Sequence, residues 1–464
     1  MSVLMRIGIV AVALTQAAPR NPFQGYWLGS LRNMRMLVHV DVDPNGHPRA
    51  ALTSLDQSWA ERVADTTTIE NGELCLQFTA MGVSFRGRLD GKNKLIGEFV
   101  QRGATSRLVL ERTEGPPDVR RRSQVPIKPY PYDEENVRFP NTKAAITFAG
   151  TLTLPRTPGP HPAVVLVSGS GPQDRDETVF EHKPFLVIAD ALTRRGIAVL
   201  RVDDRGVGGS SGSREEATSD DYTDDALAAM AFLKGRPDID GARIGLVGHS
   251  EGGLIAPLAA SRSRDVAFIV MLGGPGLPGS ELLLHQTRAL QLASGNPRQT
   301  VEFNVRLLAR VLGIVMKNTD EATIQRQVDA ALLDELAKIG KGDEATRARV
   351  QASMDLPRYR TPWMRFFLLY DPRPVLEKLT IPILAMNGEK DLQVLATENL
   401  AAIDAAFQAA SNRNGRTLLL PGLNHLFQTA KTGTVTEYAT IEETFAPAAL
   451  AAMADWIVAH TGRR

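Results

Sequence analysis

From about residue 134 onward, continuous apolar runs alternate with segments in which apolar residues recur at helical spacing. Strands are predicted at 144–154, 163–167, 197–202, 244–247, 266–272, 381–386 and 417–420. Helices are predicted at 185–194, 220–233, 254–261, 396–410 and 445–459. Apolar strands separated by helices are typical of a parallel sheet with helices on both faces, so this part is predicted to be an α/β domain spanning 134–464.

The alternation stops between residues 273 and 380, where only helical patterns occur, as at 281–293, 301–317 and 322–339. A structureless loop of about a hundred residues is improbable in a compact domain. We therefore expect a helical cap over about 275–379. It should lie over the carboxyl edge of the sheet, where such folds bind ligands.

Residues 23–112 carry a different pattern, with short alternating runs separated by turn residues such as Asn71-Gly72 and Asp90-Gly91. This spacing predicts a small antiparallel β domain, either a sandwich or a barrel. Residues 113–133 are rich in proline and predict an extended linker. The run Arg120-Arg121-Arg122 is interpreted as solvated linker rather than as a binding patch, since no basic or aromatic neighbours extend it.

The first residues have the three-part shape of a secretory signal. One positive charge precedes the apolar run 7–18, which ends in small residues and is too short to span a bilayer. A signal peptide at 1–18 predicts a periplasmic or secreted protein. The alternatives are a first strand or a misplaced start, which would leave the protein cytoplasmic. No later run reaches eighteen uncharged apolar residues, so no membrane span is expected.

Composition narrows the possible partners. The 464 residues hold 53 Lys and Arg against 52 Asp and Glu, a balance that gives no reason to expect a nucleic-acid partner. A single cysteine, Cys75, excludes an intramolecular disulfide framework and any cysteine-rich metal site. The histidines form no HExxH pattern, and no metal or cofactor is expected.

The pattern G-x-S-x-G occurs twice. Gly248-His249-Ser250-Glu251-Gly252 follows a predicted strand and runs into a predicted helix, the context that a nucleophilic serine on a strained turn requires. Gly208-Gly209-Ser210-Ser211-Gly212 has no such context and is interpreted as a loop. Ser250 is therefore the candidate nucleophile, and a plain strand-to-helix turn is the alternative.

A serine hydroxyl needs a base to remove its proton. In this sheet type the acid and the base follow the serine in chain order, each after a strand. Asp391 follows the strand at 381–386 and His425 follows the strand at 417–420, so they are the candidate acid and base. Glu389 is the competing acid.

An oxyanion hole needs two backbone N–H groups. One is expected from Glu251, and the other from the small-residue loop after the strand at 163–167, with Ser170 first and Gly169 second. A simple glycine turn is the alternative interpretation of that loop. The glycine loops fail the spacing of both nucleotide-binding fingerprints.

The chain resembles α/β-hydrolase fold serine esterases that carry an amino-terminal β-rich domain. The resemblance rests on three segments, Ser168–Asp176, Asp203–Ser210 and Gly248–Gly253, and on the opening Gly25-Tyr26-Trp27. It implies hydrolysis of small carboxylic esters through an acyl-enzyme, with Ser250, Asp391 and His425 as the catalytic triad.

Two other functions stay open at this point. The same fold holds serine peptidases of the prolyl-oligopeptidase and aminopeptidase-like types. A binding protein with an inert hydrolase fold is the rival from another class. Four aromatic residues in the cap, Trp363, Phe366, Phe367 and Tyr370, either line an acyl pocket or pack helices together.

Overall fold

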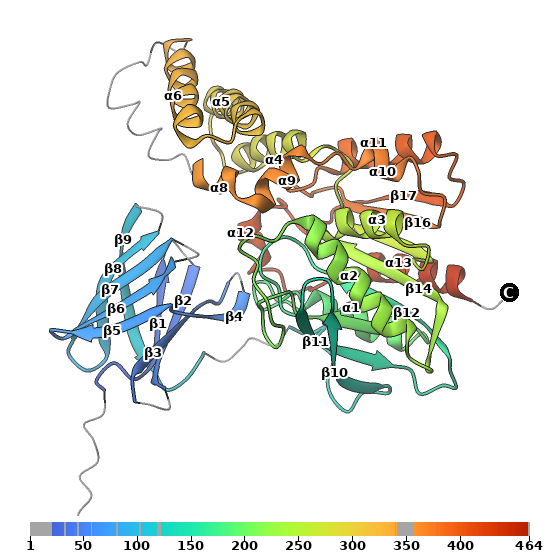
Figure 1. The fold of residues 1–464 in the computed structure, drawn as a ribbon, viewed down its shortest axis with the longest axis horizontal. Coiled ribbons are helices and arrows are strands. Elements are labelled where there is room, and N and C mark those ends of the chain that lie inside the picture. The colour runs from blue at the N-terminus through green and yellow to red at the C-terminus, as the bar shows by residue number, and fades with distance from the viewer. Residues whose placement is uncertain are drawn as a thin grey trace, which may run out of the picture. The chain divides into compact units, whose positions relative to one another are not determined.

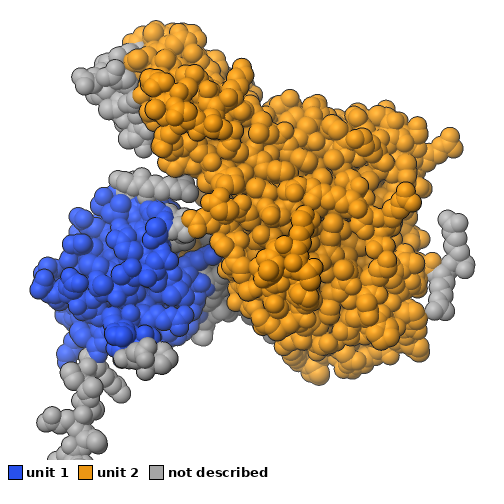
Figure 2. Space-filling view, in the orientation of Figure 1, with its two compact units in different colours: residues 1–53, 61–118 blue, residues 54–60, 119–464 orange. Residues whose placement is uncertain are grey.

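The computed structural model describes residues 21–462 except 32–33, 44–45, 57, 80–81, 102–103, 118–121, 339 and 341–355. The chain divides into two compact units, residues 1–53 with 61–118 and residues 54–60 with 119–464 (Figure 2). The expected signal peptide at 1–18 lies outside the described residues, and so do Arg120 and Arg121 of the arginine run.

The first unit is built on one nine-stranded sheet that curves into a half-barrel, with the order β4-β3-β2-β1-β9-β8-β7-β6-β5 (Figure 1). Its strands are β1 Gly25–Leu31, β2 Met34–Val42, β3 Pro48–Ser54, β4 Ser58–Val63, β5 Thr66–Glu70, β6 Glu73–Phe78, β7 Val83–Asp90, β8 Lys94–Gln101 and β9 Ala104–Thr113. Alternate residues of these strands form a core around the fully buried Trp27, whose indole N–H donates to the Phe23 carbonyl at 2.7 Å.

The second unit contains an eight-stranded sheet with the order β10-β11-β13-β12-β14-β15-β16-β17 (Figure 1). The strands are β10 Asp133–Asn141, β11 Ile146–Leu154, β12 His161–Val167, β13 Ala198–Val202, β14 Ile239–His249, β15 Phe268–Leu272, β16 Ile383–Gly388 and β17 Gly415–Leu420. The β10–β11 and β11–β13 pairs are antiparallel, whereas every later pair is parallel. The carboxyl ends of β12 to β17 therefore meet at one edge.

Helices cover both faces of this sheet, as the apolar strands require. One face packs against α1 Pro184–Thr193 and α13 Pro447–Thr461. The other packs against α2 Ser219–Lys234, α3 Gly252–Arg262, α10 Arg373–Leu376 and α11 Ala396–Ala409. A short helix, α12 Val435–Tyr438, lies in the segment between β17 and α13.

A helical cap is inserted between β15 and β16 (Figure 1). Its helices are α4 Gly279–Ala293, α5 Arg298–Lys317, α6 Glu321–Lys338, α8 Leu356–Arg360 and α9 Pro362–Leu369. Apolar residues four apart on α5 pack against a matching stripe on α6, so this pair of helices has a small core of its own. In the described part of the chain, no helix combines the length and the apolarity needed to cross a bilayer.

The expectation of a solvated arginine run is wrong at Arg122. Its side chain is buried, and the guanidinium donates to the carbonyls of Phe180, Ala439 and Ile441 at 2.9–3.0 Å. The guanidinium ties this part of the expected linker to the second unit because it satisfies carbonyl groups there.

Candidate active site

Ser250 lies on a tight turn between β14 and α3. Its φ is +54°, a left-handed conformation that costs energy for a residue with a side chain. The flanking residues must be glycine because a Cβ on Gly248 would lie 2.0 Å from the Gly252 carbonyl oxygen, and one on Gly252 would lie 2.1 Å from that of Val167. The Ser250 N–H donates to Leu272 at 2.8 Å, which joins the turn to the end of β15.

Asp391 and His425 come together from two further strand ends. Asp391 follows β16, His425 follows β17, and the His425 Nδ1 lies 2.7 Å from Asp391 Oδ2. Both side chains are buried. The other carboxylate oxygen of Asp391 accepts the N–H groups of Gln393 and Val394, each at 2.8 Å. These three hydrogen bonds fix both the carboxylate and the ring.

The competing acid, Glu389, is used elsewhere. Its carboxylate accepts the Gly422 N–H at 2.8 Å, within the turn that follows β17. The carboxylate that meets His425 is therefore that of Asp391.

Two further contacts place the Ser250 turn beside His425. The ring centroids of His249 and His425 are 4.8 Å apart, and His249 Nε2 lies 3.0 Å from the His425 carbonyl oxygen. Gly273, which follows β15, lies against the His425 ring. A Cβ at this position would be only 3.2 Å from His425 Nδ1. The strand ends of β14, β16 and β17 thus bring Ser250, Asp391 and His425 to one edge of the sheet.

Glu177 is a site residue that the sequence analysis did not identify. This buried residue accepts hydrogen bonds from His249 Nδ1 at 2.9 Å and from the Gly169 N–H at 2.7 Å. Both His249 ring nitrogens face acceptor oxygens, an arrangement that favours the doubly protonated, positively charged ring. Burial opposes this charge, but the Glu177 carboxylate outweighs it and raises the pKa of His249.

The two expected oxyanion donors differ in their hydrogen bonds. The expectation for Gly169 is corrected, because its N–H already donates to Glu177. Within the described residues, the N–H groups of Ser170 and Glu251 have no partner in the protein, and both residues line a cavity with Ser250. These two N–H groups can donate hydrogen bonds to a ligand oxygen.

That cavity has a volume of about 430 Å³ and extends from Ser250 to the cap helices. Trp363 and Phe367 line it, whereas Phe366 and Tyr370 do not and instead stack on each other at 5.5 Å. The aromatic residues of α9 thus divide between the two roles that the sequence left open. Gln393 and Val394, next to Asp391, line the cavity as well.

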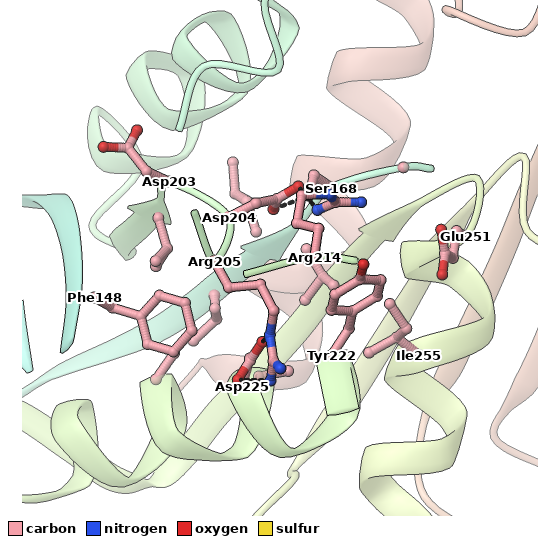
Figure 3. A pocket seen from close by; sticks show the side chains of 17 residues that line it. Phe148, Ser168, Asp203, Asp204, Arg205, Arg214, Tyr222, Asp225, Glu251 and Ile255 are labelled. Atoms are coloured by element: carbon pink, nitrogen blue, oxygen red, sulfur yellow. Dashed lines mark hydrogen bonds and ion pairs between the residues drawn. The ribbon is translucent and has the colours of Figure 1, made fainter. Parts of the chain in front are cut away.

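A second, smaller cavity of about 60 Å³ is lined by residues that include Ser168, Asp204 and Arg214 (Figure 3). Asp204 borders it and accepts from the Ser168 hydroxyl at 2.7 Å, the Gln173 N–H at 3.0 Å and Arg214 at 2.8 Å. Burial raises the pKa of Asp204 to about 7 in spite of these donors. Glu251 also borders it, and burial raises the pKa of its carboxyl group.

The two remaining motif segments bind each other. Arg175 forms a bidentate pair with Asp203, with nitrogen–oxygen distances of 3.0 and 2.6 Å. Arg201 pairs with Asp176. Ser210, in the second G-x-S-x-G match, is buried and donates to the Asp203 carbonyl at 2.8 Å. These bonds fix the base of the loop that carries Ser170, so Ser210 has a structural role.

Among the described residues, no three His, Cys, Asp or Glu side chains are grouped as a metal site would require.

Residues 164–435 match the family model described as the alpha/beta hydrolase family. Esterase EstD of Thermotoga maritima is 30% identical over 277 residues, which are 60% of this chain and 57% of that esterase, so the match spans little more than half of the relative. The structure of the alpha/beta hydrolase GrgF from a Penicillium species aligns with 17% identity and a TM-score of 0.44, over 71% of this chain and all of that one. An esterase from Pyrococcus furiosus aligns with 15% identity and a TM-score of 0.43, over 71% of this chain and 92% of that one.

Proposed function

Because the chain belongs to the α/β-hydrolase family, we propose that it is a serine esterase that cleaves small carboxylic esters of short to medium acyl length through an acyl-enzyme. The observation that carries this proposal is the buried His425–Asp391 contact beside the strained Ser250 turn. The likeness to an esterase from Thermotoga maritima supports an ester rather than another substrate.

In the proposed mechanism, the Ser250 hydroxyl attacks the ester carbonyl while His425 Nε2 takes its proton. Nδ1 donates to Asp391, which fixes the tautomer that leaves Nε2 free to accept. The Asp391 carboxylate stabilises the imidazolium that forms. His425 then protonates the leaving alcohol, and a water molecule that His425 activates releases the acid and restores Ser250.

The negative charge that develops on the carbonyl oxygen is stabilised by the N–H groups of Ser170 and Glu251. Both belong to residues that line the cavity with Ser250, and neither has another acceptor among the described residues. The Asp204 and Arg175 contacts described above hold the Ser170 loop in place before the substrate arrives.

The test is hydrolysis of p-nitrophenyl acetate and butyrate by the parent and by Ser250→Ala. We expect Ser250→Ala to lower kcat by about 10⁴-fold or more, since the remaining groups cannot supply a nucleophile. Ser210→Ala is the matched control because Ser210 occupies the same position in the second G-x-S-x-G match. Retained turnover in Ser250→Ala, or an equal loss in Ser210→Ala, contradicts the proposal.

Two further measurements test the rival functions, a serine peptidase and a binding protein. A panel of aminoacyl anilides, compared with the esters, identifies a peptidase if the anilides are cleaved at the higher kcat/KM. A fluorophosphonate probe labels an activated serine, so absence of label at Ser250 would indicate a binding protein.

A further inference from the structure

One part of the wall of the 430 Å³ cavity beside Ser250 is aromatic. Trp363 and Phe367 lie one turn apart on α9, and both line the cavity that Ser250 opens into. Their ring centroids are 5.7 Å apart and their planes differ by 10°. A stacked pair of this kind holds each ring in one orientation.

A hydrogen bond fixes Trp363 to the Ser250 turn. The indole N–H donates to Glu251 Oε1 at 2.7 Å, and the Ser219 hydroxyl donates to the same oxygen at 2.7 Å. Glu251 directly follows Ser250 in the chain, and the residue is only 4% exposed. Turning the indole aside would remove a donor from a buried carboxyl group, which is unfavourable. The ring therefore keeps a constant position relative to the nucleophile.

Another part of the wall is polar. Gln286 and Thr287 line the cavity from α4, and within the described residues neither side chain has a hydrogen-bond partner. A flexible alkyl chain lying along these groups would displace water from them without replacing its hydrogen bonds. A planar group that stacks on the aromatic wall instead leaves Gln286 and Thr287 in contact with water.

We propose that Trp363 is a specificity-determining residue and that the site favours esters with a planar aromatic group over alkyl esters of equal carbon number. Glu251 is the positioning residue that holds the indole. This inference rests on the proposed esterase function and names its substrate class.

The experiment compares methyl phenylacetate with methyl octanoate, whose acyl groups have the same number of carbon atoms. Acid release is followed in a pH-stat. The parent is expected to have a kcat/KM for phenylacetate about threefold to tenfold above that for octanoate, the range that one aromatic stacking contact supplies. Trp363→Ala is expected to remove this preference.

Four further variants separate the ring from its hydrogen bond. Trp363→Phe and Glu251→Ala keep an aromatic ring in the cavity but lose the hydrogen bond, so the ratio of kcat/KM for phenylacetate to that for octanoate should fall in both variants. Glu251→Gln keeps an acceptor oxygen and should restore the parent ratio. Phe366→Ala removes a ring from the same helix but outside the cavity, and its ratio should equal that of the parent.

A binding measurement separates this inference from the esterase proposal. Isothermal titration calorimetry of the two intact esters with Ser250→Ala gives the same preference as a ratio of Kd values, without turnover. A parent that hydrolyses neither ester contradicts the esterase proposal, and the Kd ratio then still decides the inference. A ratio that Trp363→Ala leaves unchanged, or that Phe366→Ala lowers equally, overturns the inference while the esterase function stands.

Discussion

At the scale of single residues, the groups around Ser250 and His425 explain how a strained turn is held. His249 and Glu177 form a buried ion pair that also bonds the His425 carbonyl and the Gly169 N–H. One charged pair thereby connects the Ser250 turn, the His425 loop and the loop that carries Ser170. Because its groups are buried, removal of one partner leaves the other uncompensated.

Glu177→Ala is accordingly expected to lower the free energy of unfolding by about 3–5 kcal/mol, the cost of a buried unpaired charge. It should also lower kcat by at least about tenfold, since the His425 backbone loses its support. Glu177→Gln keeps an acceptor and should lose less of both. Urea unfolding and hydrolysis of p-nitrophenyl butyrate measure the two effects. A Glu177→Ala variant as stable as the parent would show that the His249–Glu177 pair does not stabilise the folded state.

Asp204 gives a pH dependence whose direction follows from its pKa. Burial raises that pKa from 3.8 to about 7. Between these values the folded chain holds a proton on Asp204 and the unfolded chain does not. The free energy of unfolding therefore falls as the pH rises through this window and is constant, as far as Asp204 contributes, above about pH 7. The total decrease in the free energy of unfolding across this window is on the order of 4 kcal/mol.

Asp204→Asn should remove this dependence. The difference in unfolding free energy, parent minus variant, is expected to fall from about pH 4 to pH 7 and then to level off in urea titrations. Asp203→Asn is the matched control. Burial raises the pKa of Asp203, but hydrogen bonds from Arg175 outweigh burial and lower the pKa below 3.8. The stabilising contribution of Asp203 to the folded state is therefore lost only in more acidic solution. A difference curve for Asp204→Asn that rises with pH would contradict the assignment.

At the scale of elements, the buried strands were predictable from sequence, whereas the polar edge strands β5 and β10 were not. The apolar runs that form β12 to β16 are buried on both faces, so hydrophobicity alone identifies them. In contrast, β10 has the sequence Asp-Glu-Glu-Asn-Val-Arg-Phe-Pro-Asn and lies at the sheet edge, where only alternate residues are buried. β5 is likewise an edge strand, rich in threonine, and no apolar run marks it.

The site divides in the same way. Ser250, Asp391 and His425 were predictable as candidates because each directly follows a strand that hydrophobicity identifies. Glu177 lies in an irregular loop ten residues beyond the end of β12, and its φ of +51° depends on the folded surroundings. The hydrogen bond from the Gly169 N–H to Glu177 depends on the conformation of that loop. The spacing of residues along the chain could therefore not predict it.

The contact between α4 and α9 offers a test of how the cap shapes the cavity. A Cβ on Gly279 would lie 1.9 Å from the Phe367 carbonyl oxygen, so α4 can approach α9 only with glycine there. Gly279→Ala should push α9 away and move Trp363 and Phe367 with it. We expect KM for p-nitrophenyl butyrate to rise about threefold to tenfold, with a smaller change in kcat.

Gly313→Ala is the control for that substitution. Gly313 lies inside α5, and a Cβ there would meet nothing within 4 Å. Alanine should stabilise the helix by about 0.5–1 kcal/mol without altering KM. Equal KM values for Gly279→Ala and the parent would mean that the contact between the two helices does not set the shape of the cavity.

At the scale of the whole molecule, we propose that residues 1–18 direct export and are then removed. The charged start, the short apolar run and the small residues at its end support this. Protein recovered from the periplasm or the medium of a bacterial host should have an intact mass that corresponds to a chain lacking about the first 18 residues. Full-length protein confined to the cytoplasm would contradict export.

The segment that follows the first unit belongs structurally to the second. Arg122 donates to three carbonyls there, and Gln124 accepts the N–H groups of Thr444 and Phe445 while donating to the Phe445 carbonyl at 2.8 Å. These partners lie in the loop between β12 and α1 and in the segment between β17 and α13. The loop that carries His425 begins the latter segment, so the Arg122 bonds stabilise the chain that leads away from the site.

Arg122→Met in the full chain should therefore lower the stability of the second unit, because three partly buried carbonyls lose a charged donor, at up to about 1–3 kcal/mol each. The measurement is residual hydrolysis of p-nitrophenyl butyrate after incubation at increasing temperature, which reports the unit that contains Ser250. Lys128→Met is the matched control from the same segment. Lys128 is 69% exposed and pairs with Glu134 only at the surface, where an ion pair contributes little. Equal inactivation temperatures for the two variants would show that the Arg122 hydrogen bonds do not stabilise the second unit, and that this segment acts only as a linker.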